Sequence, residues 1–119
     1  MKITDITVNR IRAPQGDNAR SFVGRPGRLL LQVHTDEGIT GISEAGRNLK
    51  VVRAYLEELI KPLLVGADPT RPRKIWELLT LGEGQQATRF PSQIVGSVDV
   101  ALWDIAGKSA NLPIYQLLG

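Results

Sequence analysis

Cysteine is absent from this chain, which excludes disulfide bonds and thiolate metal sites. Histidine occurs once, as His34, so no cluster of imidazole metal ligands can form. No apolar run approaches the ~20 residues of a membrane helix, and the N-terminus has no apolar signal-peptide core. Aromatic residues make up 5% of the chain and are not interleaved with basic residues, which argues against a nucleic-acid surface. These absences predict a cytoplasmic protein that binds neither membrane nor nucleic acid.

The composition that remains is that of an ordinary globular domain. The chain has 119 residues, of which 42% are hydrophobic and 23% charged, enough for one domain with a modest core. The net charge is +3, and the basic excess lies within residues 1–28. These arginines are either solvated surface groups or an anion-attracting lip, because guanidinium groups match carboxylate and phosphate.

Three segments have the alternating, β-branched pattern of strands. They are Ile3–Ile11, Arg28–Thr35 and Ile39–Glu44. The second and third are separated by an Asp-Glu-Gly turn and form a hairpin, to whose edge the first strand adds. Residues 14–27 are all turn and loop formers, and a connection this long is typical of a functional lid or of disorder.

Three later segments have the apolar spacing of helices, at residues 51–64, 70–81 and 91–110. Pro62 should end or kink the first helix, Thr70 is the expected N-cap of the second, and Asn111 stops the third. The broad apolar face of the third helix predicts burial from more than one side. Strands followed by helices indicate an α+β fold, a three-stranded antiparallel meander followed by three helices.

Few residues point to chemistry on their own. His34 is expected to be a strand-surface residue, and the stretch from Gly82 to Ala87 matches a dinucleotide fingerprint by letters only, since no strand precedes it. Asp99 and Asp104 are carboxylates on a largely apolar helix, for which we expect structural roles, with Asp104 paired to Lys108 four residues later. Glu44 ends a strand and is either a solvated turn residue or part of a site.

Two longer motifs carry a family resemblance. The stretches Ser97–Lys108 and Leu112–Gly119 resemble the pattern A-l-W-D-i-x-G-K-x-x-x-x-P-l-x-x-L-L-G of the mandelate racemase / muconate-lactonising enzyme family, in the enolase superfamily. Thr35–Gly41 resembles its T-D-E-G-x-x-G hairpin, and the Asp68-Pro69 pair also fits. The stretch Gly41–Glu44 departs from the family's G-x-G-E, with serine in place of the second glycine.

The resemblance implies that residues 1–119 are the N-terminal capping domain of an enzyme whose catalytic β/α barrel is absent from this sequence. The family's Mg²⁺, bases and metal ligands belong to that barrel, where the metal binds a small carboxylate substrate and the α-proton is removed. We therefore expect no catalytic residue, metal ligand or cofactor in this chain, and no activity of this chain alone. An acid-sugar dehydratase or racemase is the expected parent, with cycloisomerase left open.

The resemblance also implies two loops that close over the substrate. They correspond to the loop Pro14–Gly27 and the segment Glu44–Leu49. By position in these loops, the candidate substrate-capping residues are Arg20, Phe22, Arg25 and Arg47. The arginines suit an anionic substrate, and Phe22 would shield it from water.

Other functions remain open at this point. A stand-alone module of the same fold that dimerises or docks a partner is the main alternative, and a basic nucleic-acid binder is a weaker one that rests only on an isoelectric point of about 9.6. A bare apolar face on the third helix would promote self-association. The expected partners of the capping domain are the C-terminal barrel, the substrate and other copies of the chain.

Overall fold

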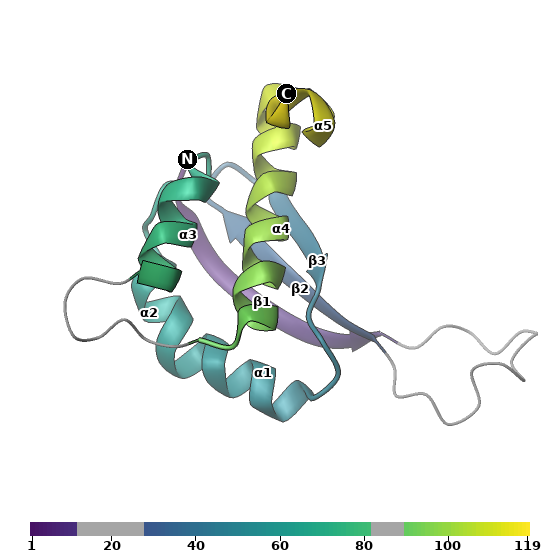
Figure 1. Ribbon diagram of the computed structural model, residues 1–119, viewed down its shortest axis with the longest axis vertical. Helices are drawn as coiled ribbons and strands as arrows, with labels where there is room; N and C mark the ends of the chain where they lie inside the picture. The colour runs from purple at the N-terminus through teal and green to yellow at the C-terminus, as the bar shows by residue number, and fades with distance from the viewer. Residues whose placement is uncertain (12–27, 82–89) are drawn as a thin grey trace, which may run out of the picture.

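Three strands form one antiparallel sheet in the order β1-β2-β3, as the sequence predicts. The computed structural model describes residues 1–11, 28–81 and 90–119 (Figure 1). The strands are β1 (Ile3–Ile11), β2 (Arg28–Thr35) and β3 (Thr40–Glu44). Gly38 takes a φ of +79° in the β2–β3 turn, a conformation that glycine adopts without steric cost. The predicted Pro14–Gly27 lid and the Gly82–Ala87 stretch lie outside the described residues.

The first predicted helix is one continuous rod with an irregular middle. It consists of α1 (Leu49–Tyr55), the π-helical turn η2 (Leu56–Ile60) and α2 (Lys61–Leu64). Asn48 begins it by accepting a hydrogen bond from the Val51 backbone N–H at 3.2 Å. The wide turn lies directly before Pro62, which has no N–H to give to a regular α-helical ladder. The rod ends at Leu64, soon after the proline, as predicted.

The remaining helices are α3 (Pro72–Leu81), α4 (Ser92–Ala110) and a short α5 (Ile114–Leu118) that the sequence analysis missed. The prediction of Thr70 as the N-cap of α3 is wrong. Its backbone N–H and its hydroxyl both donate to the Asp68 carboxylate, at 2.9 and 2.6 Å, so the hydroxyl belongs to the preceding turn. Asn111 ends α4 in the left-handed conformation with φ 52°, as its role as a stop implies.

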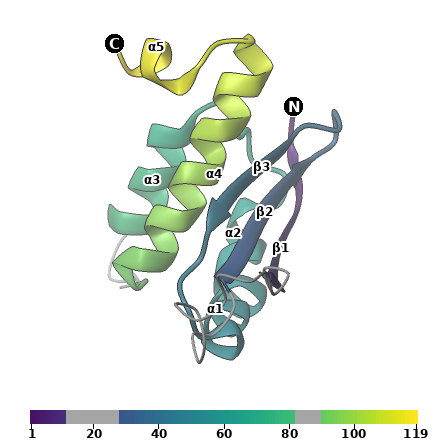
Figure 2. The ribbon, with the colours of Figure 1, turned by 90° about the vertical axis from the view of Figure 1, so that its right-hand side faces the viewer.

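The core lies between the sheet and a layer of helices on one of its faces. Helices α3 and α4 lie side by side across this face, and the α1–α2 rod runs along the β1 side (Figures 1 and 2). Fully buried side chains come from the sheet, the α1–α2 rod and α4, and they include Ile6, Leu31, Val33, Leu56, Ile60, Val98, Leu102 and Ile105. The alternation of burial along β2 places Leu29, Leu31 and Val33 on the inner face. The α+β prediction is confirmed.

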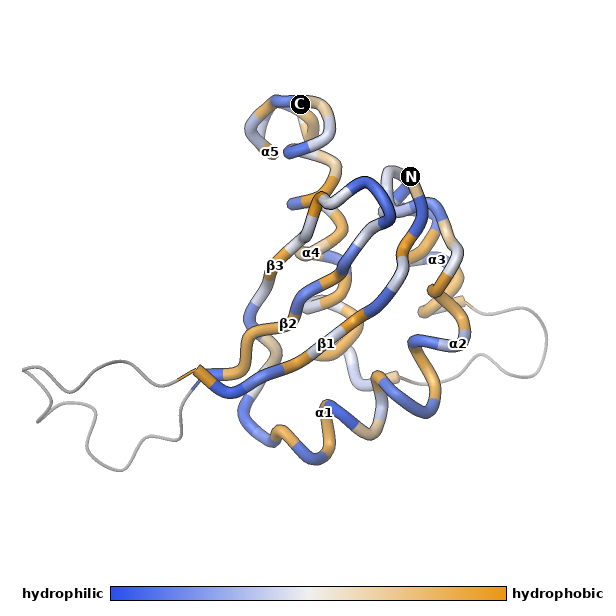
Figure 3. Tube along the Cα trace, turned by 180° about the vertical axis from the view of Figure 1, so that it is seen from behind, coloured by the Kyte–Doolittle hydropathy of each residue, from blue (hydrophilic) through white to orange (hydrophobic). Residues whose placement is uncertain are grey.

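No helix among the described elements covers the outer face of the sheet, and hydrophilic residues recur along its strands (Figure 3). His34 is half-buried there, with Nε2 3.1 Å from the Thr7 hydroxyl and Nδ1 3.3 Å from the Thr40 hydroxyl. The imidazole therefore joins all three strands. The expectation of a strand-surface histidine is confirmed.

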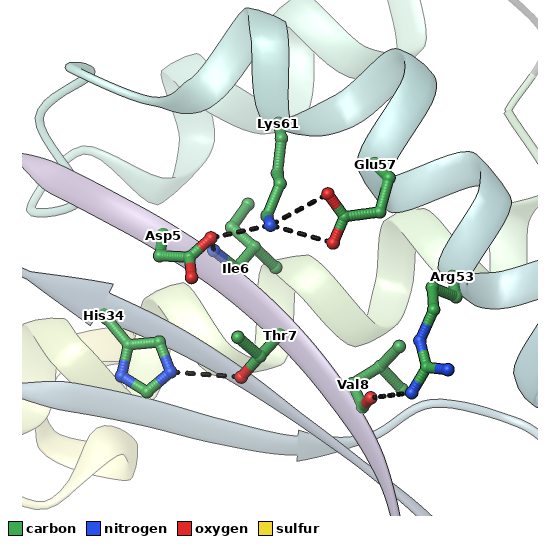
Figure 4. A network of polar contacts seen from close by, with 8 residues as sticks. All are labelled: Asp5, Ile6, Thr7, Val8, His34, Arg53, Glu57 and Lys61. Carbon is green, nitrogen blue, oxygen red and sulfur yellow. Dashed lines mark hydrogen bonds and ion pairs between the residues drawn. The ribbon is translucent and has the colours of Figure 1, made fainter.

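The outer edge of β1 is covered by groups from the α1–α2 rod and the turn after it. The Arg53 guanidinium donates to the Val8 carbonyl at 3.1 Å, and the Asp5 carboxylate accepts from the Ile6 N–H at 2.8 Å (Figure 4). The Ile3 N–H and carbonyl bond to the backbone of residues 66 and 67. Because these groups occupy the edge, strand addition by a partner is blocked along much of β1.

Lys61 connects the rod to β1 through two carboxylates (Figure 4). Its Nζ lies 2.8 Å from both Asp5 Oδ1 and Glu57 Oε1, which confirms the Glu57–Lys61 pair predicted from sequence. The hydrogen bond from Lys61 lowers the pKa of Asp5, and the bonds to Asp5 and Glu57 raise the pKa of Lys61. The folded state therefore favours the charged form of both groups.

The Asp5–Lys61 pair should make stability depend on pH in acid. Because the pKa of Asp5 is lower in the folded chain, its contribution is present above the ordinary Asp pKa of about 3.9 and is lost as pH falls through the folded value. Asp5→Asn should lower the free energy of unfolding at pH 7 by about 0.5 kcal/mol, a small effect because both groups are partly solvated. Urea unfolding at pH 7 and pH 3 should show a smaller difference in the free energy of unfolding at the lower pH. Glu58→Gln, on the same rod, is the control, and an equal loss at both pH values would contradict the ion-pair explanation.

Candidate functional site

The segment Glu44–Leu49, expected to cover a substrate, begins at the end of the sheet where β1 stops at Ile11 and β2 starts at Arg28. Ile11, the last described residue of β1, pairs with Arg28, the first residue of β2, so the described chain stops and resumes at this end of the sheet. Glu44, at the end of β3, pairs in register with Leu30, two residues further along β2. Arg28 and Glu44 form an ion pair at 2.6 Å across these strands. The segment Glu44–Leu49 therefore starts beside Arg28, the first described residue after the gap.

Arg47 is exposed on the connection between β3 and α1, as a lid residue would need to be. The connection turns at Gly46, whose φ is +72° and whose missing Cβ would lie 3.2 Å from Gln93 Nε2 on α4. Asn48 then fixes the start of α1. Arg20, Phe22 and Arg25, the other three candidates, lie outside the described residues.

The charge at this end of the sheet is mainly positive. The exposed basic residues near the ends of the strands and the start of α1 are Arg10, Arg28, Arg47 and Lys50, and Glu44 is the acidic residue among them. Arg28 is held by Glu44, whereas Arg47 projects from a turn. Cationic groups around a loop base raise the local concentration of anions.

A metal centre is not built into the part of the chain that the structure describes. Within residues 1–11, 28–81 and 90–119, no three His, Cys, Asp or Glu side chains gather closely enough to hold an ion. Over the same residues, no helix combines the length and apolarity needed to cross a membrane.

Helix α4 holds the strand that leads to this site. Asp104 Oδ2 accepts from the Ile42 backbone N–H at 3.0 Å, and Lys108 Nζ donates to the Thr40 carbonyl at 2.7 Å. The Asp104–Lys108 ion pair predicted from sequence is confirmed, at 2.6 Å. Their bonds to the backbone of β3 have no signal in the sequence, because only the tertiary structure brings residues about sixty positions apart into contact.

Two serines extend the contact between β3 and α4. Ser43, which replaces a glycine of the family pattern, donates its hydroxyl to the Ser97 carbonyl at 2.6 Å. The Ser97 hydroxyl lies 2.8 Å from the carbonyls of both Glu44 and Gln93. Both serines are buried, so their hydroxyls need these partners. The departure from the family pattern is therefore compensated by a hydrogen bond to α4.

The side of α4 opposite the sheet is an unusual helix surface. At Gly96 a Cβ would meet open space, although glycine in a helix interior costs about 1 kcal/mol relative to alanine. Val100, one turn later, is 53% exposed. Partial burial raises the pKa of Asp99, while a hydrogen bond with Trp103 acts in the opposite direction. We call Gly96, Asp99, Val100 and Trp103 the outer face of α4.

The chain matches a family model and many longer proteins. Residues 3–119 match the family model described as mandelate racemase / muconate lactonizing enzyme, N-terminal domain. The sequence is 42% identical over 106 residues to a D-mannonate dehydratase of Novosphingobium aromaticivorans, covering 85% of this chain and 26% of that one. It is 44% identical over 108 residues to a D-galactonate dehydratase family member of Halomonas elongata, covering 87% and 27%.

Solved structures agree with these sequence matches. A mandelate racemase/muconate lactonizing family protein from Azoarcus sp. EbN1 superposes with a TM-score of 0.79 at 32% identity, covering 100% of this chain and 31% of that one. An enolase from Agrobacterium radiobacter, with sodium and L-malate bound, gives a TM-score of 0.77 at 31% identity, covering 100% and 28%. The chain thus spans about a quarter to a third of the length of these relatives.

Proposed function

Because the chain belongs to the mandelate racemase / muconate lactonizing enzyme family, through that family's N-terminal domain, we propose that residues 1–119 form the substrate-capping domain of an acid-sugar dehydratase. The observation that carries the proposal is the 42–44% identity, over most of this chain, to D-mannonate dehydratase and to a D-galactonate dehydratase family member. A racemase on the same fold is the second candidate within this family.

The chain's own contribution is binding and enclosure. Arg47 is exposed on the connection that follows β3, near the end of the sheet where Ile11 pairs with Arg28, a position suited to attracting a sugar acid's carboxylate. Arg20, Phe22 and Arg25 are proposed to act with it from the Pro14–Gly27 loop. Enclosing the substrate would exclude water from the reacting groups.

Metal chemistry is assigned elsewhere. Mg²⁺ would stabilise the enediolate formed when the proton next to the carboxylate is removed. The described residues offer no set of ligands for it. We therefore place Mg²⁺ and the catalytic base in the β/α barrel that this family of enzymes carries after its N-terminal domain.

The partner of the capping domain is proposed to dock on the outer face of α4 and on α5. Tyr115 and Leu118 on α5 are 70% and 62% exposed, and Val100 on α4 is 53% exposed. The open space over Gly96 allows another backbone to approach closely. The relatives are much longer than this chain, and the barrel formed by their remaining residues is the proposed occupant of this surface. When the barrel is missing, these apolar groups are free to drive self-association.

A chimera tests the proposal. This chain would replace the matching first quarter of the Novosphingobium D-mannonate dehydratase, and Mg²⁺-dependent dehydration of a panel of acid sugars would be measured. We expect the chimera to dehydrate at least one of them, and the 119-residue chain alone to be inactive, with a melting temperature that does not respond to Mg²⁺. A folded chimera of native size that is inactive on the whole panel would sink the proposal.

Within the chimera, Arg47→Ala is expected to raise KM for the sugar acid about tenfold or less, with a smaller effect on kcat, because Arg47 binds substrate and takes no part in proton transfer. Lys50→Ala is the matched control, because Lys50 is an exposed cation three residues later, in the first turn of α1. Equal effects of the two substitutions would show that only the general positive charge matters and that Arg47 has no specific role.

A further inference from the structure

The outward edge of β3 is bonded to side chains of α4 in place of a fourth strand. In an antiparallel strand the outward-pointing backbone groups belong to alternate residues, here Thr40, Ile42 and Glu44. Helix α4 supplies a partner to one backbone group of each of these three residues. Lys108 donates to the Thr40 carbonyl, Asp104 accepts from the Ile42 N–H, and Ser97 donates to the Glu44 carbonyl. We call Ser97, Asp104 and Lys108 the β3 clamp.

The spacing of the clamp fits the strand it holds. Its residues are seven and four positions apart, which places them along one side of a helix. From Ser97 to Lys108 the helix rises ~16 Å, and from Glu44 to Thr40 the strand extends ~14 Å. The helix therefore runs antiparallel to the strand and matches its length. Gly41 allows this approach, since a Cβ there would overlap the Ala101 carbonyl oxygen.

The clamp ends at the candidate site. Ser97 holds the carbonyl of Glu44, the last residue of β3, and Gln93, one turn earlier, lies against Gly46. The segment Glu44–Leu49 with Arg47 starts from this anchored point. The outer face of α4 lies on another side of the same helix. One rigid helix thus carries the strand on one side and the proposed docking surface on another.

We propose that Ser97, Asp104 and Lys108 are positioning residues that fix the axial position of β3 on α4 and thereby set where Arg47 stands relative to the docked partner. The geometry of the clamp is independent of the proposed function, and only its relation to a substrate rests on that function. The clamp also occupies the β3 edge, as the α1–α2 rod occupies that of β1, so partners that add a strand are excluded there.

The competing explanation is an ordinary i,i+4 ion pair, which contributes only to the helix. Asp104→Asn separates the two explanations. The amide oxygen of asparagine still accepts from the Ile42 N–H, but the charge that pairs with Lys108 is gone. Asp104→Ala removes both. If Asp104 acts by accepting from the Ile42 N–H, asparagine should keep β3 protected and alanine should not. If Asp104 acts only as a charge, asparagine and alanine should have the same effect on β3.

Amide hydrogen exchange of the 119-residue chain, resolved by residue with NMR, measures the effect directly. Asp104→Ala should make the Ile42 amide exchange about tenfold faster, the factor expected for one lost charge-assisted hydrogen bond. Asp104→Asn should restore most of the protection. Glu77→Ala, which breaks the exposed Arg73–Glu77 pair on α3 at the same i,i+4 spacing, should leave Ile42 unchanged.

Ser97→Ala provides a second, milder test because it leaves the Asp104–Lys108 pair intact. It should raise exchange severalfold at Ala45, whose N–H bonds the Leu29 carbonyl at 2.9 Å next to the anchored end of β3. This variant decides the matter if Asp104→Ala does not fold. The proposal is overturned if asparagine and alanine at position 104 behave alike, or if Ala45 is unaffected by Ser97→Ala. Neither result depends on substrate, so an inactive chimera would leave the clamp standing.

Discussion

Gly41→Ala is expected to lower the free energy of unfolding by about 3 kcal/mol, at the upper end of the usual cost of overpacking a core. Gly41 is buried in β3 where α4 packs along the strand. A Cβ at this position would overlap the Ala101 carbonyl oxygen and lie 2.7 Å from Ile105 Cγ1. The first of these atoms is backbone within a regular helix, so it cannot move aside as a side chain can. Urea unfolding followed by circular dichroism measures the loss.

Gly96→Ala is the matched control for this prediction. It makes the same change on α4, at a helical position where a Cβ meets nothing within 4 Å. There the added methyl should stabilise the isolated chain by about 0.5–1 kcal/mol, because alanine is the better helix former. If the two substitutions cost the same, close approach at Gly41 would not be the cause.

Leu102→Ala is expected to destabilise the chain by about 3 kcal/mol. Leu102 is fully buried on the inner face of α4, within the core that the sheet, α3 and the α1–α2 rod share. Truncation there removes apolar contacts and leaves a cavity that the surrounding elements cannot fill by collapsing. The urea concentration at the unfolding midpoint should fall, while the dependence of the free energy of unfolding on urea concentration should stay unchanged.

Val100→Ala, two residues away on the same helix, serves as the comparison. Its side chain is 53% exposed on the outer face of α4, so the change should stay within about 0.5 kcal/mol. In a complex with the partner, Val100 is proposed to be covered, so Val100→Ala should cost more. The difference in destabilisation between Leu102→Ala and Val100→Ala should therefore become smaller. A large loss at Val100 in the isolated chain would mean that this face is already packed, for example by another copy.

The strands were predictable because their signal is local. Alternation and β-branched residues placed Ile3–Ile11 and Arg28–Thr35 at their observed bounds, and the Asp-Glu-Gly turn fixed the hairpin between β2 and β3. The missed α5 is five residues long, too short for a periodic pattern. The predicted N-cap of α3 was wrong because a threonine before a helix can either cap the helix or bond to the preceding turn. Sequence alone does not say which of these hydrogen bonds Thr70 makes.

The candidate site was predictable only in outline. The family motif located its two loops, and the structure brings Ile11, Arg28 and Glu44 to one end of the sheet. Arg47 stays a prediction as a substrate-binding residue, as do Arg20, Phe22 and Arg25. For Asp104, helical spacing indicated a partner in Lys108 and gave no sign of a contact with the strand.

By itself, then, the sequence determined the element types, the α+β class and the family, since periodicity, turn residues and motifs are written in neighbouring positions. Only the tertiary structure decided which polar groups far apart in the sequence form hydrogen bonds with each other. Ser97, Asp104 and Lys108 satisfy the edge of β3, and Arg53 satisfies that of β1, over separations of about 45 to 68 residues. Such partners are chosen because a half-buried backbone group left unpaired is costly, and folding selects the arrangement that pairs it.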